Sequence, residues 1–289
     1  MTRSRRRVAV LLHENERRDG VDSYAVGHLA EFWRQDGLDV RFLWGVEERV
    51  PADVLLVHVN LSVVPDAYLE FARGYPVALN AGVRDVRKSA FSANLLTPGD
   101  AWDGPVIVKS DLNYAGRPER KLLSSRTGWL RSRLLRPRRG FRSQLDYRVY
   151  ARLADVPRGC FRRHDLVIER FLPERDGELY CVRTYQFLGP SQTTVRIASR
   201  SPIVSTRNHC CVESIEPDRA IVAARHAMAF DYGKFDYVLH EGRPVLLDVN
   251  KTTGAAARRD ASLDHERRLR AAGIHAFLDD SARASGALA

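Results

Sequence analysis

The sequence predicts an α/β domain followed by an α+β region, and two observations support this. Over residues 1–95, short β-branched and leucine-rich runs alternate with helical patterns, as in an open parallel sheet with helices on its faces. After residue 147, strand-like runs follow one another across glycine turns, which indicates antiparallel pairing. The chain of 289 residues with 44% hydrophobic content is long enough for a substantial core.

The first region contains four expected strands and two expected helices. Apolar residues recur at helical spacing in the first helix, where Asp22 or Ser23 is expected to cap the start and Gly37 to mark the end. The strands are expected at residues 7–15, 38–45, 52–60 and 75–80, and the helices at 22–37 and 65–74.

The second region begins with a strand at 104–110, a polar turn at 110–119 and an amphipathic piece at 127–135. Later strands are expected at 166–172, 178–189, 193–199, 235–241 and 243–250, helices at 216–233 and 263–280, and a frayed end at 281–289. We therefore expect three domains. They are an N-terminal α/β domain at 1–95, a subdomain at 96–165 that carries a basic insert at 117–163, and a C-terminal subdomain at 166–289.

Positive charge is concentrated in one segment. The chain has a net charge of +10, and residues 117–163 hold 15 basic residues against three acidic ones.

No apolar run is long enough for a signal peptide core or a membrane span. The four cysteines form no C-x-x-C pair, so neither a disulfide framework nor a structural zinc site is expected, and a cytoplasmic location is predicted.

The most informative stretch is the expected hairpin at 235–250. It places Asp236 on one strand and Asp248 and Asn250 on the next, where two-residue spacing sends both side chains to one face. Carboxylate and amide oxygens without Cys or His suit Mg²⁺, which usually bridges to substrate phosphates. This pattern alone is weak, and ordinary strand-end acids are an equal alternative.

A lysine at the end of a buried-looking strand strengthens the phosphate interpretation. Lys109 ends the run VIVK, where a buried lysine is costly unless it meets an anion. The polar turn after it contains Ala115 and Gly116, small residues that let backbone N–H groups approach a phosphate. Neither a P-loop nor a dinucleotide-binding fingerprint is present.

With these motifs in this order, residues 88–254 resemble the ATP-grasp superfamily of carboxylate–amine ligases, and the α/β segment before them resembles the domain that precedes it there. The resemblance implies the ATP-grasp fold, with ATP and Mg²⁺ as cofactors. The residues that it implies for nucleotide binding are Lys88 and Lys109 at the phosphates, Glu169, Arg170, Phe171 and Leu172 at adenine, and Glu178, or alternatively Glu174, at the ribose. It further implies that Arg196 and Lys234 contact the transferring phosphate and that Asp236, Asp248 and Asn250 hold the metal.

The activity implied is formation of an acyl phosphate from a substrate carboxylate and its capture by an amine or other nucleophile. The turn at 110–119 departs from the small-residue loop usual in this family, and the sequence does not identify the small-molecule or peptide substrates. A kinase or a nucleotide-binding scaffold of the same fold is the alternative within the superfamily. His13, Asn80, Arg183 and Arg200 are further candidates for substrate contact, each with a purely structural role as the alternative.

The basic insert supports a different class of function. Fifteen cations suit a module for nucleic acid or an anionic membrane surface, a lid over an anionic substrate, or a merely solvated surface. No nucleic-acid fold signature accompanies them, which disfavours nucleic acid. A homodimer is the default oligomer.

Overall fold

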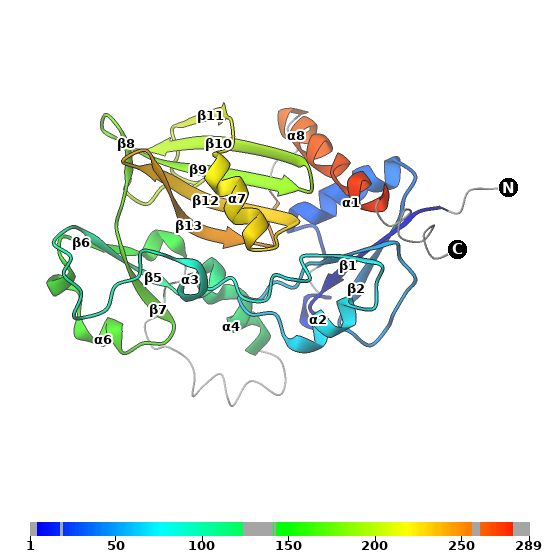
Figure 1. Ribbon diagram of the computed structural model, residues 1–289, viewed down its shortest axis with the longest axis horizontal. Helices are drawn as coiled ribbons and strands as arrows, with labels where there is room; N and C mark the ends of the chain where they lie inside the picture. Colours follow the sequence, from blue (N-terminus) through cyan, green and yellow to red (C-terminus); the bar gives the residue numbers. More distant parts are fainter. Residues whose placement is uncertain (1–4, 18–19, 124–140, 142, 256–260, 280–289) are drawn as a thin grey trace.

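The computed structural model describes residues 5–17, 20–123, 141, 143–255 and 261–279. Within them, the chain forms a four-stranded, a three-stranded and a six-stranded sheet (Figure 1). The first sheet is parallel and the other two are antiparallel. The predicted succession of an α/β region and an α+β region is therefore confirmed. The predicted amphipathic piece at 127–135 and the predicted frayed end lie outside the described residues.

The four-stranded sheet has the order β2-β1-β3-β4, and all its pairs are parallel. Alternate residues of β1 enter two different apolar clusters, one with Trp33 of α1 and the other with Phe71 of α2. The two helices therefore cover opposite faces of the sheet, as its strand–helix alternation predicts. The elements are β1 (Arg7–Leu12), α1 (Ala25–Gln35), β2 (Asp39–Trp44), β3 (Val54–Val57), α2 (Asp66–Ala72) and β4 (Val77–Leu79).

The start of α1 differs from the prediction. Its N-cap is Tyr24 rather than Asp22 or Ser23, and no side chain caps it. The Ala25 amide instead donates to the Thr253 carbonyl at 2.9 Å. A backbone group from the far end of the chain thus satisfies one of the free amides of the first turn. The end is as predicted, because Gly37 follows the helix with φ of +86°.

The six-stranded sheet has the order β11-β10-β9-β12-β13, with β8 added beside β9. In Figure 1, α7 lies across one face of this sheet. Ile221 of α7 packs there with Phe235, Tyr237 and Val249. The elements are β8 (Glu174–Asp176), β9 (Leu179–Leu188), β10 (Ser191–Ser199), β11 (Cys211–Ile215), α7 (Arg219–Ala227), β12 (Tyr232–His240) and β13 (Arg243–Asn250).

The three-stranded sheet has β5 at its centre, with β6 and β7 on either side. Its strands are β5 (Val106–Ser110), β6 (Arg148–Tyr150) and β7 (Leu166–Arg170), and the short helices near it are α3 (Lys88–Phe91), α4 (Arg117–Leu123) and α6 (Arg158–Phe161). The last helix, α8 (Ala261–Ala272), lies beside α1, where the Trp33 indole donates to the Ala271 carbonyl at 2.9 Å. No helix in the described part of the chain is long and apolar enough to cross a membrane.

One asparagine joins the four-stranded sheet to the six-stranded sheet. Asn80 follows β4 with φ of +58°. Its Oδ1 accepts from the amides of Asp231 and Tyr232 at 2.9 and 3.1 Å, and its Nδ2 donates to the Tyr232 carbonyl at 2.8 Å. The side chain is fully buried, so the structure gives Asn80 a structural role between sheets.

Candidate functional site

Two neighbouring strands bring four polar residues onto one face of the six-stranded sheet. Asp236 of β12 stands opposite Asp248 of β13, and Lys234 stands opposite Asn250. Because directly opposed residues share a face and side chains alternate along a strand, all four point the same way. The predicted metal-binding group is therefore gathered together with one of the two predicted catalytic cations.

Each carboxylate of this group is paired with a lysine. Lys234 Nζ lies 2.7 Å from Asp236 Oδ2, and Lys88 Nζ lies 3.1 Å from Asp248 Oδ1. Burial by itself lowers the pKa of both lysines, but the carboxylate beside each outweighs burial, and both pKa values are raised. Both lysines thus carry a positive charge beside the acids at neutral pH.

The third lysine comes from the three-stranded sheet. Lys109 forms a buried ion pair with Glu169 on the adjacent strand, and its Nζ also donates to the Leu247 carbonyl at 3.3 Å. Lys109 therefore connects β5 to β13 at the edge of the site. The second oxygen of Glu169, Oε1, is buried and has no hydrogen-bond partner in the described structure.

Four further residues complete the surroundings of the acids, and the sequence analysis did not assign them. Thr184 Oγ1 donates to Asp236 Oδ1 at 2.8 Å. Asn113 Nδ2 donates to Asn250 Oδ1 at 2.9 Å, and Gln144 Nε2 to Asp248 Oδ2 at 3.5 Å. Tyr147 places a buried hydroxyl nearby, and burial is the main cause that raises its pKa to about 12. Only Asn113 carried a sequence signal, because it lies in the polar turn predicted at 110–119.

The polar turn between β5 and α4 has an unusual backbone. Tyr114, Ala115 and Gly116 follow one another with φ of +49°, +54° and +68°. The left-handed region costs a residue with a Cβ roughly 1–2 kcal/mol. Strained backbone of this kind clusters at functional sites. The turn therefore carries backbone strain close to the site, because Asn113 of the same turn contacts Asn250.

The segment predicted to hold adenine, residues 169–172, already uses some of its backbone amides in hydrogen bonds within the protein. The amides of Arg170 and Phe171 donate to the carbonyls of Asn94 and Pro105, both at 2.9 Å. The exposed Arg170 guanidinium lies 5.1 Å from the Trp102 ring centroid. Leu172 follows β7 as a partly buried residue.

The two ribose candidates occupy different environments. Glu178 is exposed in the turn that joins β8 to β9. Glu174 is buried and accepts from Arg183, Arg196 and the Leu239 amide. Burial would raise the pKa of Glu174, but these donors outweigh burial and lower it. Neither carboxylate contacts the group formed by Asp236, Asp248, Asn250, Lys88 and Lys234, which we call the acid–lysine cluster.

Arg196 is not brought to the cluster. It stands opposite Arg183, whereas Asp236 stands opposite Thr184. Residues 183 and 184 are neighbours in one strand and point to opposite faces. Arg196 therefore lies on the α7 face, where it pairs with Glu174 and Asp176. Arg183 is held there too, and Arg200 is exposed after β10.

The other early candidate, His13, is nearly buried at the end of β1. Its Nδ1 accepts from the Asn15 amide at 3.2 Å, and its ring stacks on Tyr68 with centroids 5.5 Å apart. His13 therefore caps the short turn at Glu14–Glu16.

The donor atoms suit a hard cation. In the described ranges no three His, Cys, Asp or Glu side chains gather as a metal cluster, so a metal here relies on two carboxylates and one amide. Such an oxygen-only set, short of a full cage, fits Mg²⁺, which keeps waters and bridges to phosphates. The lysines paired with the acids place positive charge beside this set of oxygens, where phosphate groups would need it. The residues present therefore fit Mg²⁺ with a bound polyphosphate.

Several solved structures share the overall fold of this chain. D-alanine–D-alanine ligase from Bacillus anthracis superposes with a TM-score of 0.52 at 12% identity, over 97% of this chain and 99% of that one. The ATP-grasp ligase PsnB, complexed with minimal precursor, Mg and ADP, gives 0.52 at 13% identity, over 94% and 97%. D-alanyl-alanine synthetase A from Vibrio cholerae gives 0.51 at 10% identity, over 96% and 99%.

No protein-family model matches the sequence, and neither does any curated protein. The structural likeness therefore establishes the fold. It is a mixed α/β architecture in which a parallel sheet precedes two antiparallel sheets. The chain has the ATP-grasp fold, as the motif order in the sequence indicated.

Proposed function

We propose that this protein is an ATP- and Mg²⁺-dependent ligase that joins a carboxylate to an amine or another nucleophile and releases ADP and phosphate. The observation that carries the proposal is the register of β12 and β13. It sets Asp236 opposite Asp248 and Lys234 opposite Asn250 on one face of an ATP-grasp fold. Two ligases of this fold are described as complexes with ATP or with Mg and ADP.

The proposed reaction needs positioning and positive charge more than a side-chain nucleophile. A substrate carboxylate oxygen attacks the γ-phosphorus of ATP, the bond to the β-phosphate oxygen breaks, and ADP leaves. The amine nitrogen then attacks the carbonyl carbon of the acyl phosphate, phosphate leaves with the C–O bonding electrons, and the amine loses a proton. Bound Mg²⁺ would neutralise phosphate charge.

The lysines have separate proposed roles. Lys88 and Lys109 hold the polyphosphate, and Lys234 stabilises the charge that develops on the transferring phosphoryl group. Lys234 is preferred to Arg196 for this role because Arg196 lies on the opposite face. Adenine is assigned to the segment 169–172 and the ribose to Glu178, as the family resemblance implies. A cytoplasmic location remains part of the proposal.

The test is a screen of amino acids, small peptides and polyacids for ADP release that depends on Mg²⁺ and on both an acid and a nucleophile. Amide or ester formation with free phosphate supports the ligase. A phosphorylated product identifies a kinase, and nucleotide binding without turnover identifies a scaffold; either result overturns the proposal. Asp248→Ala is the negative variant, and its Tm must be measured as well because Lys88 loses its buried partner. Mg²⁺-dependent turnover at the normal rate in that variant would overturn the metal assignment.

A further inference from the structure

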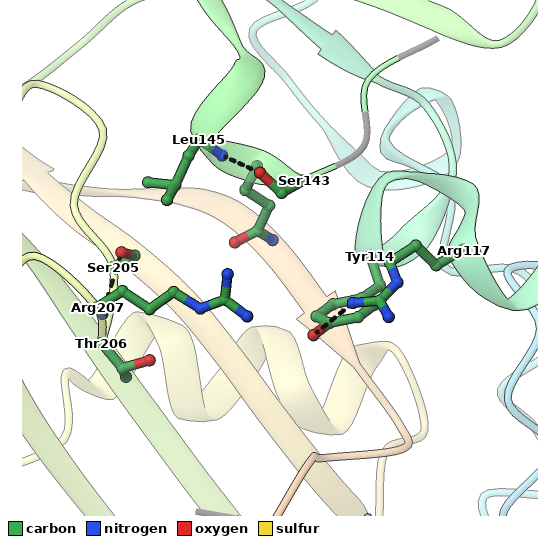
Figure 2. A pocket seen from close by; sticks show the side chains of 8 residues that line it. Tyr114, Arg117, Ser143, Leu145, Ser205, Thr206 and Arg207 are labelled. Atoms are coloured by element: carbon green, nitrogen blue, oxygen red, sulfur yellow. Dashed lines mark hydrogen bonds between the residues drawn. The ribbon is translucent and has the colours of Figure 1, made fainter.

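A pocket lies beside the acid–lysine cluster, between three segments that are distant in sequence. Its walls come from the strained turn after β5, the segment at 143–145 before β6, and the loop between β10 and β11 (Figure 2). Gln144 lines the pocket and also reaches Asp248 Oδ2 at 3.5 Å. The pocket is therefore connected to the proposed reaction site through Gln144.

The charges of the pocket are one-sided. Its lining holds two arginines, Arg117 and Arg207, and no Asp or Glu. Within the described part of the chain, neither guanidinium is paired with a carboxylate. Arg183 and Arg196, on the far face of the sheet, are both tied to acids. The two pocket arginines thus have no acid partner among the described residues and are available to a ligand from outside.

The geometry aims these groups at a shared space. Figure 2 shows the Arg207 side chain pointing from its loop towards the space between Ser143 and the Tyr114 ring. On the opposite wall, Arg117 lies against Tyr114, with Cζ 5.1 Å from the ring centroid. Hydroxyl groups complete the wall, including that of Ser143. Paired guanidinium and hydroxyl donors are the chemistry that binds a carboxylate.

The loop that carries Arg207 is held in shape. Asn208 Oδ1 accepts from the Ser205 amide at 2.8 Å, and its Nδ2 donates to the Ile203 carbonyl at 2.7 Å. The Asn208 carbonyl accepts from Ser199 Oγ at 2.8 Å. These bonds fix the loop to the end of β10, so Arg207 is presented from an ordered support.

We propose that this pocket binds a second anionic group of the substrate acid, so that the preferred substrate is a dicarboxylate such as an acidic amino acid. The inference rests on the proposed ligase function, because one carboxylate must react at the phosphate while the other is held by Arg117 and Arg207. The pocket then selects the substrate by charge, since a monocarboxylate leaves both arginines without a partner.

The test is a binding titration on the full chain with saturating ADP and Mg²⁺. Glutarate is the probe, acetate at matched ionic strength is the reference, and thermal unfolding is the readout. We expect a saturable rise in Tm with glutarate, roughly 3 °C at ten times its Kd, and none with acetate. Arg207→Ala and Arg117→Ala should each weaken glutarate at least tenfold, and Arg207→Lys less. Arg219→Ala, an exposed arginine on α7, should bind glutarate as the wild type does.

The remaining outcomes separate this inference from its alternatives. If glutarate fails to bind, or binds equally well to Arg207→Ala, the inference is wrong. If Arg207→Ala weakens ATP tenfold but not ADP, the pocket serves the terminal phosphate and the inference is also wrong. If glutarate binds through Arg207 but no acid elicits ADP release, the pocket stands and the ligase proposal falls. If monocarboxylates elicit ADP release but glutarate does not bind, the ligase proposal stands and the inference about the pocket falls.

Discussion

Lys88 and Asp248 are 160 residues apart in sequence, yet their Nζ and Oδ1 atoms lie 3.1 Å apart. Their side chains are only 2% and 8% exposed. The pair joins the segment before the three-stranded sheet to the last strand of the six-stranded sheet. A buried charge that loses its partner is strongly destabilising, whereas an apolar replacement of both partners often is not.

This pair predicts a contrast between stability and activity. Lys88→Met should lower the free energy of unfolding by about 3 kcal/mol, because Asp248 is left buried without its cation. The double variant Lys88→Met/Asp248→Leu should recover most of that loss but show no Mg²⁺-dependent ATP turnover. Urea unfolding and ADP release measure the two effects. A double variant no more stable than the single one would contradict this interpretation.

Asp236→Asn isolates the metal role from folding. The asparagine keeps an oxygen that can accept from Thr184, but Lys234 loses its ion pair with Asp236. Because these two side chains are partly exposed, Tm should fall less than in Lys88→Met. Loss of one charged ligand should reduce turnover on the order of 100-fold. Binding of Mn²⁺ in the presence of ADP, followed by electron paramagnetic resonance, should weaken in parallel. Asp176→Asn, an exposed acid on the α7 face, is the control, and equal metal affinity in both variants would exclude Asp236 as a ligand.

The strained turn predicts opposite effects for two neighbouring substitutions. Ala115→Gly should raise the free energy of unfolding by roughly 0.5–1 kcal/mol, because glycine adopts a positive φ without the Cβ clash. Gly116→Ala should lower it by about 1 kcal/mol, since its Cβ would lie 3.1 Å from Leu112 Cδ1. Gly99→Ala, with nothing within 4 Å, is the control. We also expect Ala115→Gly to bind ATP less tightly, and a loss of stability in that variant would refute the strain.

His58 predicts how stability depends on pH. It is fully buried between the rings of Tyr24 and Tyr232, and burial is the main cause that lowers its pKa from 6.5 to about 3. Between these values the unfolded chain binds one more proton at His58 than the folded chain, so stability falls as the pH drops below 6.5. The loss at pH 5 is about 2 kcal/mol.

His58→Leu should remove that part of the acid sensitivity. Its urea midpoint should decline less between pH 6.5 and 5 than the wild-type midpoint, whereas His226→Leu, at an exposed position on α7, should follow the wild type. An identical decline in all three proteins would show that His58 does not resist protonation in the folded state.

Local patterns in the sequence were sufficient for the succession of elements and for the grouping of Asp248 with Asn250, since both depend on spacing within one segment. They were also sufficient for the end of α1 at Gly37. They failed at its start, because the group that satisfies the Ala25 amide is the Thr253 carbonyl, more than 200 residues away in the printed sequence. Such a partner leaves no trace in the neighbouring residues.

The placement of Arg196 shows a second limit. Its face of the sheet is set by the register with β9, where it meets Arg183 rather than Thr184. A shift of one residue would have turned it to the face that carries Thr184 and Asp236, and spacing along the chain does not contain that information. Thr184 and Gln144 were missed for the same reason, since each reaches the site only through pairing or loop packing.

Asn80 also limits whether the four-stranded sheet can be separated from the rest of the protein. Because its amide satisfies the backbone of Asp231 and Tyr232, removal of the first sheet would leave these groups without partners inside the remaining protein. The α/β region is therefore not expected to be separable from the rest of the protein as an independent domain. Chimeras that exchange it with a distant homologue should fold only when the graft carries this asparagine and its recipient strand together.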